Sequence, residues 1–559
     1  MPATAAVSPN FTLQQRVSYV CSRLLAYGLP VVLFLVACSF YLKTYDSAQI
    51  KITFTQVGTI ALMMVWLTKM LVDGKLPFSN ADLVYVAPFL AFLASGLIAW
   101  AHSPFKPWAF EETMRRVFYM VIAMLAVAEI RTNERRTRLW RWLMAAAFVT
   151  VGYGVVQYID SRFFPAPAPG LDPFIWRQAF SKRVFSTFGN PNFYGNFLVI
   201  ITPMILASVL RVKGSLGRPF LLLVITAVMV VLLDKMQVGI FGGLDPSYDI
   251  LVGGVIVALL GLFFFYSFWG TSKAGSLPMF LMLFALLFLN LYSTETKGAW
   301  VGFTVALAVT VWLIFEYFLH FEERLIQGKT YFPFMVGVGV LFGLLILGMV
   351  IAFVVPLLRH TVAQIGFQIL WVPTLIAATL ALLTMLYLAK KPWNLKKMIY
   401  GGLMFFILTM GAIVLQFAKT RLTSVSFRMF TWISTWEMIR TEPVLGHGVG
   451  TFKVIYPAYR RPHIIVLEGR SNTETDHSED EYLETWQDEG IFGFGILLWM
   501  ISTALAAGLK QLRWYSRLRR PGHHKMLDID SDPRSYEVLG YLGAYFGALI
   551  HWAFDVSIR

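Results

Sequence analysis

The chain has 559 residues, of which 57% are hydrophobic and 14% charged, and its mean hydropathy is +0.63. Soluble proteins carry roughly a quarter of their residues as charged side chains, so this composition excludes an ordinary soluble protein. The net charge of +15 does not lead us to expect a nucleic-acid partner, because Lys and Arg collect in the cytoplasmic loops of membrane proteins. The two cysteines, Cys21 and Cys38, lie in or beside the first apolar run and indicate neither a disulfide framework nor a metal site.

Apolar runs recur along the whole chain, and each is long enough for a helix to cross roughly 30 Å of hydrocarbon. They do not alternate with polar residues as the strands of a transmembrane barrel do. We therefore predict an all-α, polytopic membrane helix bundle of about 12 to 15 spans, with one long structured outer loop and no cleavable signal peptide. The predicted spans lie near 24–42, 53–72, 82–101, 116–130, 139–159, 193–210, 219–234, 250–268, 278–292, 299–319, 332–355, 366–389, 398–417, 490–508 and 537–554.

Basic loops set the predicted orientation. Clusters of Lys and Arg follow the fourth, twelfth and fourteenth spans, and all of them lie on one side if every span is real. We expect that side, and with it the N-terminus, to be cytoplasmic. The clusters comprise Arg131, Arg135, Arg136, Arg138, Arg141, Lys390, Lys391, Lys396, Lys397, Arg513, Arg517, Arg519, Arg520 and Lys525.

The same count places segments 160–190, 293–298 and 419–489 on the outer face. We expect three parts in the chain: an N-terminal transmembrane bundle, a large loop that carries the catalytic site, and a pair of C-terminal transmembrane helices. These parts span 1–418, 419–489 and 490–559.

The first outward motif is Arg183 followed by the sequence STFGNPNFYGN, which begins at Ser186 and leads into the sixth span. Gly, Asn and Pro favour a turn here, and we expect Asn192 to cap the following helix. A helix N-terminus beside an Arg suits a phosphate group. From spacing alone, an ordinary interfacial turn with Arg183 extended toward lipid headgroups is the favoured alternative.

The second motif, LYSTETKGAWVG, places Lys297 between two apolar runs. Lys297 can face a cavity at the membrane edge, or it can anchor the helix at the interface beside Trp300.

The third is the loop 419–489, which far exceeds usual connection lengths. Its opening stretch places Arg428, Trp432 and Trp436 at i, i+4 and i+8, which predicts one face of a helix lying along the interface. The glycine-rich stretch that begins at Pro443 lacks a preceding strand and a final Lys-Ser or Lys-Thr pair, so we do not interpret it as a phosphate loop.

The loop ends on the sequence TDHSEDEYLETWQDEGIFGFG, in which His477 stands among acidic residues. An imidazole beside carboxylates suits a general base. A Mg²⁺ or Ca²⁺ site at the cluster from Asp476 to Glu481 and a solvated acidic helix start are the alternatives. In the last span, His551 and Asp555 lie at i and i+4, where a structural polar pair is favoured.

Together and in this order, the motifs resemble those of the O-antigen ligase family, within the ligase and polymerase superfamily of bacterial surface polysaccharide assembly. Two departures from the family pattern stand out. Lys297 replaces the usual Arg, and alignment on Tyr482 and Leu483 places Glu479 where the family His is often found, two residues after His477. The matching stretches are Arg183 with Ser186 to Asn192, Thr296 to Trp300, Arg428 and Trp432 with Pro443 to Gly448, and His477 to Gly493.

The resemblance implies a GT-C-like fold of the multi-span, lipid-donor type in the bacterial inner membrane, with its site facing the periplasm. It implies a donor glycan on undecaprenyl diphosphate and a glycolipid or glycan acceptor such as lipid A core. We expect inverting transfer, which needs no metal cofactor if cationic side chains neutralise the diphosphate. A polymerase, a protein oligosaccharyltransferase and a polysaccharide or lipid transporter remain alternatives.

On this basis, Arg183, Lys297 and Arg428 would hold the diphosphate, and His477 would act as the base. The residues that we expect to bind substrate are Arg428, Asn192, Trp432, Asp480, Glu481 and Tyr482.

Overall fold

The computed structural model describes residues 12–40, 48–163, 183–211, 276–314, 317, 422–462, 475–518 and 533–553. Every regular element in these ranges is helical, which confirms the predicted all-α class. Five predicted spans lie outside the described residues: 219–234, 250–268, 332–355, 366–389 and 398–417. The helices are α1 (Leu13–Cys38), α2 (Ala48–Asp73), α3 (Asn80–His102), α4 (Lys106–Glu129), α5 (Asn133–Phe163), η1 (Ser186–Phe188), α7 (Pro191–Arg211), α10 (Ser276–Thr294), α11 (Lys297–Leu313), α16 (Leu422–Thr441), α17 (Phe452–Ile455), η5 (Tyr456–Tyr459), α19 (Glu481–Leu518) and α20 (Pro533–Trp552).

Among the described helices, α1, α2, α3, α5 and α19 are long and apolar enough to cross a membrane. The protein is therefore a multi-pass membrane protein. Many large apolar side chains on these helices are exposed, including Val57 and Met64 of α2, as expected for surfaces that face lipid tails.

Two helices begin about ten residues before the predicted spans. α1 begins at Leu13 because Thr12 caps it: the Thr12 hydroxyl accepts from Gln15 N, and Gln15 Oε1 accepts from Thr12 N. α4 begins at Lys106, and its polar first half is stabilised by ion pairs, including Arg116 with Glu489 of α19. Hydropathy alone detects neither start.

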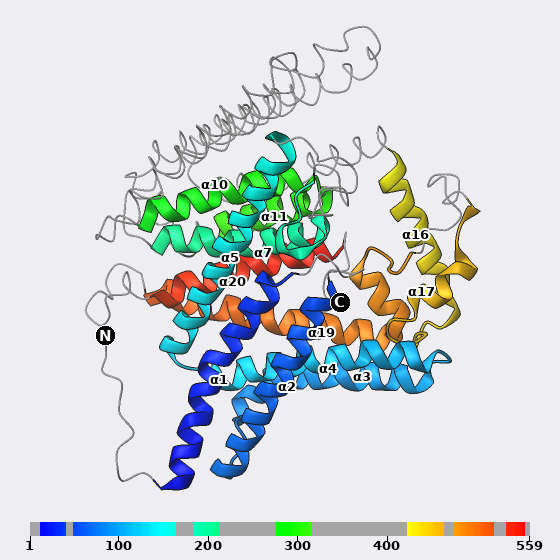
Figure 1. The fold of residues 1–559 in the computed structure, drawn as a ribbon. Coiled ribbons are helices and arrows are strands. Elements are labelled where there is room, and N and C mark those ends of the chain that lie inside the picture. The colour runs from blue at the N-terminus through cyan, green and yellow to red at the C-terminus, as the bar shows by residue number, and fades with distance from the viewer. Residues whose placement is uncertain are drawn as a thin grey trace, which may run out of the picture.

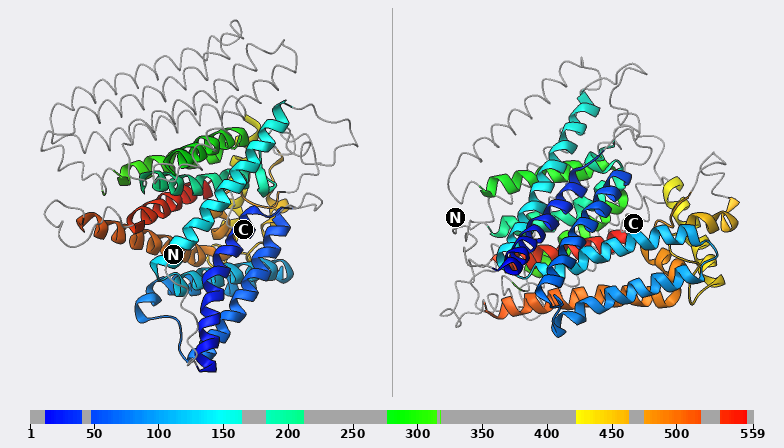
Figure 2. Two further views of the ribbon diagram at one scale, coloured as in Figure 1. Left: turned by 60° about the vertical axis from the view of Figure 1, so that its left-hand side comes forward. Right: turned by 60° about the horizontal axis from the view of Figure 1, so that its bottom comes forward.

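The helices form two packed groups (Figures 1 and 2). In one, α20 packs on α7 and α11, and α10 packs on α7 and α5. In the other, α1 packs on α2, while α19 packs on α3, which packs on α4. Contacts of α1 with α5 and of α19 with α20 join the groups. Helix α16 and the short helix α17 lie at the end of α3 and α4, beside the start of α19 (Figure 1).

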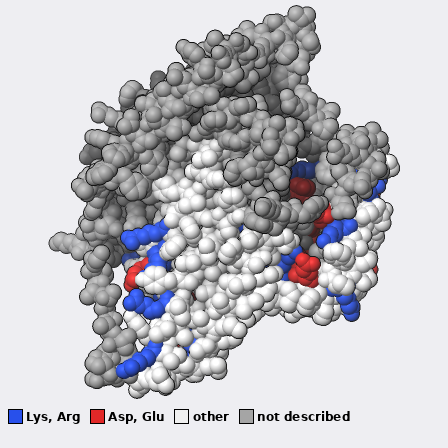
Figure 3. Space-filling view, in the orientation of Figure 1, with Lys and Arg blue, Asp and Glu red and all other residues white. Residues whose placement is uncertain are grey.

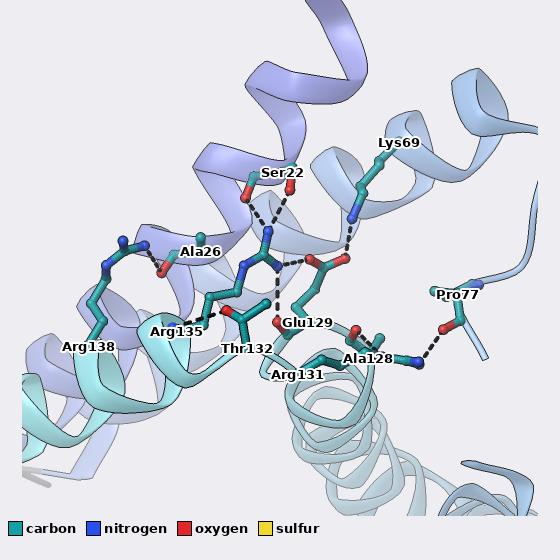
Figure 4. A network of polar contacts seen from close by, with 10 residues as sticks. All are labelled: Ser22, Ala26, Lys69, Pro77, Ala128, Glu129, Arg131, Thr132, Arg135 and Arg138. Carbon is teal, nitrogen blue, oxygen red and sulfur yellow. Dashed lines mark hydrogen bonds and ion pairs between the residues drawn. The ribbon is translucent and has the colours of Figure 1, made fainter. Parts of the chain in front are cut away.

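The predicted cytoplasmic end carries a polar network between α1, α2, α4 and α5 (Figure 4). Glu129, which is buried at the end of α4, pairs with Lys69 at 2.6 Å and with Arg135. Arg131 pairs with Asp82 at 2.8 Å. Arg131 and Arg135, at and after the α4–α5 connection, are therefore paired with acidic residues of the same chain.

The opposite end of α4 meets the long loop. Near the start of α4, the Trp108 ring lies 4.0 Å from Nζ of Lys453 in α17. On the face that Figure 3 shows, charged side chains gather in two groups separated by a band without Lys, Arg, Asp or Glu. This arrangement is the one expected when α4 runs between two aqueous faces.

α19 bends sharply at Gly490, whose φ of 65° and ψ of −165° are almost restricted to glycine. The glycine-rich turn from Pro443 packs against this bend. It donates to a backbone carbonyl at the end of the first helical segment, where intrahelical partners are missing: Gly448 N donates to Asp488 O at 2.9 Å. A Cβ on Gly446 would lie 2.4 Å from Asp488 backbone atoms. These glycines therefore permit a close backbone approach and do not form a phosphate loop.

We expect Gly490→Ala to destabilise the protein by at least about 3 kcal/mol, because it adds backbone strain and a steric clash. The new Cβ would lie 2.1 Å from the carbonyl oxygen of Val444. The matched control is Gly495→Ala in the same helix, where a Cβ meets nothing within 4 Å. Thermal unfolding in detergent measures both; equal unfolding temperatures for the two variants would contradict the prediction.

Candidate functional site

Arg183 lies at the junction of three segments. Its Nε donates to Thr294 O at 2.8 Å, and its Nη2 donates to Asn192 Oδ1 and Thr296 Oγ1, both at 3.2 Å. Burial lowers the pKa of the guanidinium, and the nearby carboxylate of Glu295 opposes that shift. Arg183 therefore joins the start of α7 to the α10–α11 connection and brings a half-buried positive charge to it.

The cap of α7 differs from the predicted one. Asn190, and not Asn192, caps the helix: Asn190 Oδ1 accepts from Asn192 N at 2.8 Å. The reason is Pro191, which occupies the first helical position, where proline is favoured, and shifts the cap to the preceding residue. The side chain of Asn192 is thereby available to contact Arg183.

Gln157 of α5 holds the turn before α7 and was not predicted as a site residue. Gln157 Oε1 accepts from Ser186 N at 2.6 Å and from Phe185 N at 3.3 Å. Ser186 has a positive φ of 49°, a conformation that these bonds and its own bond to Thr150 O help to maintain. A lone amide inside an apolar span is the sequence signal for such a residue.

Lys297 is the first residue of α11 and follows the N-cap Thr296 directly. Because Thr296 accepts from Arg183, the start of α11 lies beside the Arg183 side chain. Close packing holds the helices there: a Cβ on Gly195 of α7 would lie 2.7 Å from the Cβ of Ala299. Arg183, Asn192 and the α11 N-terminus therefore form one cluster, which we call the arginine cluster.

His477 is oriented by a buried carboxylate. Its Nδ1 lies 2.8 Å from Glu484 Oε1, and the Glu484 side chain is fully buried, whereas that of His477 is 40% exposed. Ser478 N and Ser478 Oγ donate to the other oxygen of Glu484 at 2.7 and 3.0 Å. When Nδ1–H donates to Glu484, Nε2 carries the lone pair that can take a proton.

Glu479 has a different arrangement. Its backbone has a positive φ of 60°, and its carboxylate pairs with Arg428 of α16 at 2.9 Å. This ion pair fixes the first turn of the predicted interfacial helix to the segment that carries His477. The sequence assigned Arg428 and His477 to one loop, and the structure brings them to adjacent positions.

The predicted face of α16, which carries Arg428, Trp432 and Trp436, contacts α19 and the segment just before it. Arg428 reaches Glu479, and two turns later Trp436 makes an edge-to-face contact with Trp486 at 5.5 Å between ring centroids. Trp432 lies between these contacts and is half-buried, but its Nε1 is buried without a hydrogen-bond partner in the part of the chain that the structure describes.

Asp480 caps α19. Its Oδ1 accepts from Tyr482 N at 2.9 Å and from Leu483 N at 3.0 Å. Burial raises the pKa of Asp480 to about 6, although these two hydrogen bonds oppose the shift, and Glu484 adds to it. The start of α19 thus holds a carboxyl group whose ionised form is disfavoured.

This pKa predicts the sign of a pH effect on stability. A carboxyl whose pKa is raised on folding binds its proton more tightly in the folded state, so its contribution falls as pH rises from about 4 to about 6. Asp480→Asn keeps a capping oxygen and removes the charge. We expect a higher unfolding temperature than wild type at pH 7.5, with the difference vanishing near pH 4. A lower unfolding temperature at pH 7.5 would contradict this account.

Helix α20 connects the two clusters. Tyr482 OH donates to Leu549 O of α20 at 2.8 Å. A Cβ on Gly302 of α11 would lie 3.4 Å from His551 Cβ, and the charge of Arg428 acts on His551. Helices α7 and α11, which carry parts of the arginine cluster, and helix α19, which follows the His477 segment, therefore pack against the same helix. Asp555, the predicted partner of His551, lies outside the described residues.

The acidic residues around His477 diverge. Asp476 is exposed, Glu479 pairs with Arg428, and Asp480 caps α19. Glu481 is buried, and its charge acts on Tyr119 of α4. Within the described ranges, no three His, Cys, Asp or Glu residues are arranged to hold a metal ion. The side chains at the proposed divalent-ion position therefore do not fit a common ligand shell.

Comparison with known proteins gives one family. Residues 282–498 match the family model described as O-antigen ligase. This range contains the α10–α11 connection, α16, and the segment from His477 to the bend of α19. No curated protein matches the chain.

Proposed function

We propose, on the premise that this chain belongs to the O-antigen ligase family, that it transfers a glycan from undecaprenyl diphosphate to an acceptor sugar hydroxyl. The family match supports a membrane enzyme of the O-antigen ligase and polymerase type. The observation that carries the proposal is the His477–Glu484 pair, an oriented imidazole beside α19, which packs on α20 together with the helices α7 and α11 that carry the arginine cluster.

In this reaction, the acceptor oxygen forms a bond to the anomeric carbon while the bond from that carbon to the diphosphate oxygen breaks. The acceptor proton goes to Nε2 of His477, and the electron pair leaves with undecaprenyl diphosphate. Attack opposite the leaving group inverts the anomeric centre.

The arginine cluster would stabilise the charge that develops on the diphosphate. Arg183 is held by three hydrogen bonds, so its charge is fixed before the substrate binds, which is the condition for strong transition-state stabilisation. The N-terminus of α11, with Lys297, adds a helix end suited to a phosphate. Arg428 would also contact the diphosphate once its ion pair with Glu479 is broken.

We propose the bacterial inner membrane as the location, with a cytoplasmic N-terminus and a periplasmic site. The arginine network of α4 and α5 and the loop near Trp108 lie at opposite ends of α4, which supports this orientation. Cysteine accessibility measures it: a Cys at an exposed position of α16 should react with a membrane-impermeant reagent, and a Cys in place of Asn133 should not.

Purified protein in vesicles, supplied with lipid-linked glycan and lipid A core, tests the function. A ligase attaches glycan to lipid A core, whereas a polymerase lengthens the lipid-linked chain and gives a ladder without that acceptor. A transporter would move the glycan without forming a bond. We place the ligase first because the motifs of this chain, in their order, resemble those of the O-antigen ligase family. Absence of any new glycosidic bond would contradict both enzyme proposals.

Metal independence is a separate proposal. The cationic side chains of the arginine cluster can neutralise a diphosphate without a divalent ion. We expect transfer to continue at an unchanged rate in excess EDTA. A rate that falls in EDTA and returns with Mg²⁺ or Ca²⁺ would support the divalent-ion alternative.

A further inference from the structure

Gln487 is a polar side chain that the mechanism above does not use. It is fully buried in the first segment of α19, and neither amide atom has a hydrogen-bond partner in the described part of the chain. Buried polar groups in proteins are paired with few exceptions. An amide with both its donor and its acceptor unused, three residues after Glu484, therefore calls for a functional explanation.

The position of Gln487 directs it toward His477. Side chains in a helix lean toward the N-terminus and cover the preceding turn. The Gln487 side chain therefore leans toward Leu483 and Glu484, and Glu484 holds Nδ1 of His477. Glu484 and Gln487, three residues apart, therefore lie on neighbouring positions of the same side of α19.

Helix α16 carries a second buried donor that makes no hydrogen bond within the described residues, the indole N–H of Trp432. The contacts of Arg428 with Glu479 and of Trp436 with Trp486 show that α16 and the start of α19 run in the same direction side by side. Trp432 lies midway between these contacts, and its buried Nε1 has no partner among the described residues. Helix α16 and the first segment of α19, which contact each other, thus each bury a polar group that makes no hydrogen bond within the described residues.

We propose that Gln487 and Trp432 form a subsite for the acceptor sugar, in which the Gln487 amide both donates to and accepts from hydroxyl groups. The inference rests on the proposed function and assigns its acceptor site. Vicinal hydroxyls present a donor and an acceptor together, which an amide can match, and the indole adds a donor and an apolar ring face. A phosphate headgroup offers acceptors only and would leave the Gln487 oxygen unused.

Because Gln487 is fully buried, binding requires a movement that exposes the first segment of α19. That segment is separated from the rest of the helix by the bend at Gly490.

The test replaces Gln487 with Met, which keeps an unbranched side chain of similar size and removes both polar atoms. We expect the KM for lipid A core to rise roughly tenfold to a hundredfold, as for the loss of two hydrogen bonds, while the KM for lipid-linked glycan stays unchanged. The unfolding temperature without substrate should not fall, because the amide makes no hydrogen bond there. A purely structural role predicts the reverse pattern: lower stability with an unchanged acceptor KM.

Two further variants complete the design. Thr59→Val in α2 removes a buried hydroxyl that also lacks a partner among the described residues but lies away from the site, and it should leave both KM values unchanged. Trp432→Phe keeps an aromatic ring but loses the N–H donor, so it tests the subsite even where Gln487→Met fails to fold; its acceptor KM should rise severalfold.

Binding without turnover gives an independent readout. Lipid A core alone should raise the unfolding temperature of wild type and raise that of Gln487→Met less at the same concentration. Wild type that transfers glycan, with Gln487→Met and Trp432→Phe retaining the wild-type acceptor KM, would overturn this inference and leave the function intact. Wild type that forms no glycosidic bond would remove the proposed function and this inference together.

Discussion

His477→Ala should reduce glycan transfer by a factor of about 10² to 10⁴, the usual contribution of a general base. Glu484→Gln should also lower the rate by at least about tenfold, because an uncharged amide cannot stabilise the imidazolium that forms as His477 takes the proton. The fully buried Glu484 touches His477 from within the protein, so it acts as a positioning residue. Initial transfer rates at saturating donor and acceptor measure both effects, since the loss should lie in kcat.

The matched control is His447, another histidine of the same loop. Its ring contacts Thr441 Oγ1 and the backbone carbonyl oxygen of Gln487, and burial lowers its pKa. His447→Asn should transfer glycan at close to the wild-type rate. Full activity of His477→Ala at wild-type membrane levels would exclude His477 as the base, and Glu479→Gln would then be the variant to measure.

The second large effect is expected at Arg183. Arg183→Ala should reduce transfer by a factor of about 10³ or more, because it removes a fixed charge from the proposed diphosphate site. Arg183→Lys should recover only part of that loss: an ammonium group keeps the charge but cannot reproduce the planar set of bonds to Thr294, Asn192 and Thr296. The dependence of the rate on lipid-linked glycan concentration distinguishes weaker donor binding from slower chemistry.

Arg138 offers the control for Arg183. It pairs with Glu134 and lies 3.8 Å from the Tyr27 ring, in the polar network at the predicted cytoplasmic end. Arg138→Lys should therefore leave the donor KM unchanged. A donor KM and a kcat at wild-type values in Arg183→Lys and Arg183→Ala alike would rule out the diphosphate role.

Periodicity predicted one element of the candidate site, the helix that carries Arg428. The spacing of Arg428, Trp432 and Trp436 correctly indicated a helix with one shared face, and the structure brings that face against α19. Composition predicted the all-α membrane class. The partner of Arg428 could not be predicted, because charge alone does not distinguish Glu479 from the other carboxylates nearby.

Other features depended on contacts between distant segments. Glu484 reaches back to His477 because the chain turns at Ser478, and Gln157 holds a turn that follows it by nearly thirty residues. Local signals existed for the missed helix ends: Thr12 and Gln15 form a capping box, and Pro191 indicates Asn190 as the cap. The predicted span boundaries follow hydropathy, and hydropathy does not register capping residues.

The network around Glu129 has a consequence for biogenesis. Arg135 belongs to α5, whereas Glu129 ends α4, so the two can pair only once both helices are in place. During insertion, the arginines of this connection would therefore act as uncompensated charges that resist translocation. After folding, this network of hydrogen bonds and ion pairs links α1, α2, α4 and α5 (Figure 4). The arginines of the α4–α5 connection would thus set the orientation of the nascent chain and later stabilise the folded bundle. A Glu129→Gln variant should therefore impair folding without reversing the topology.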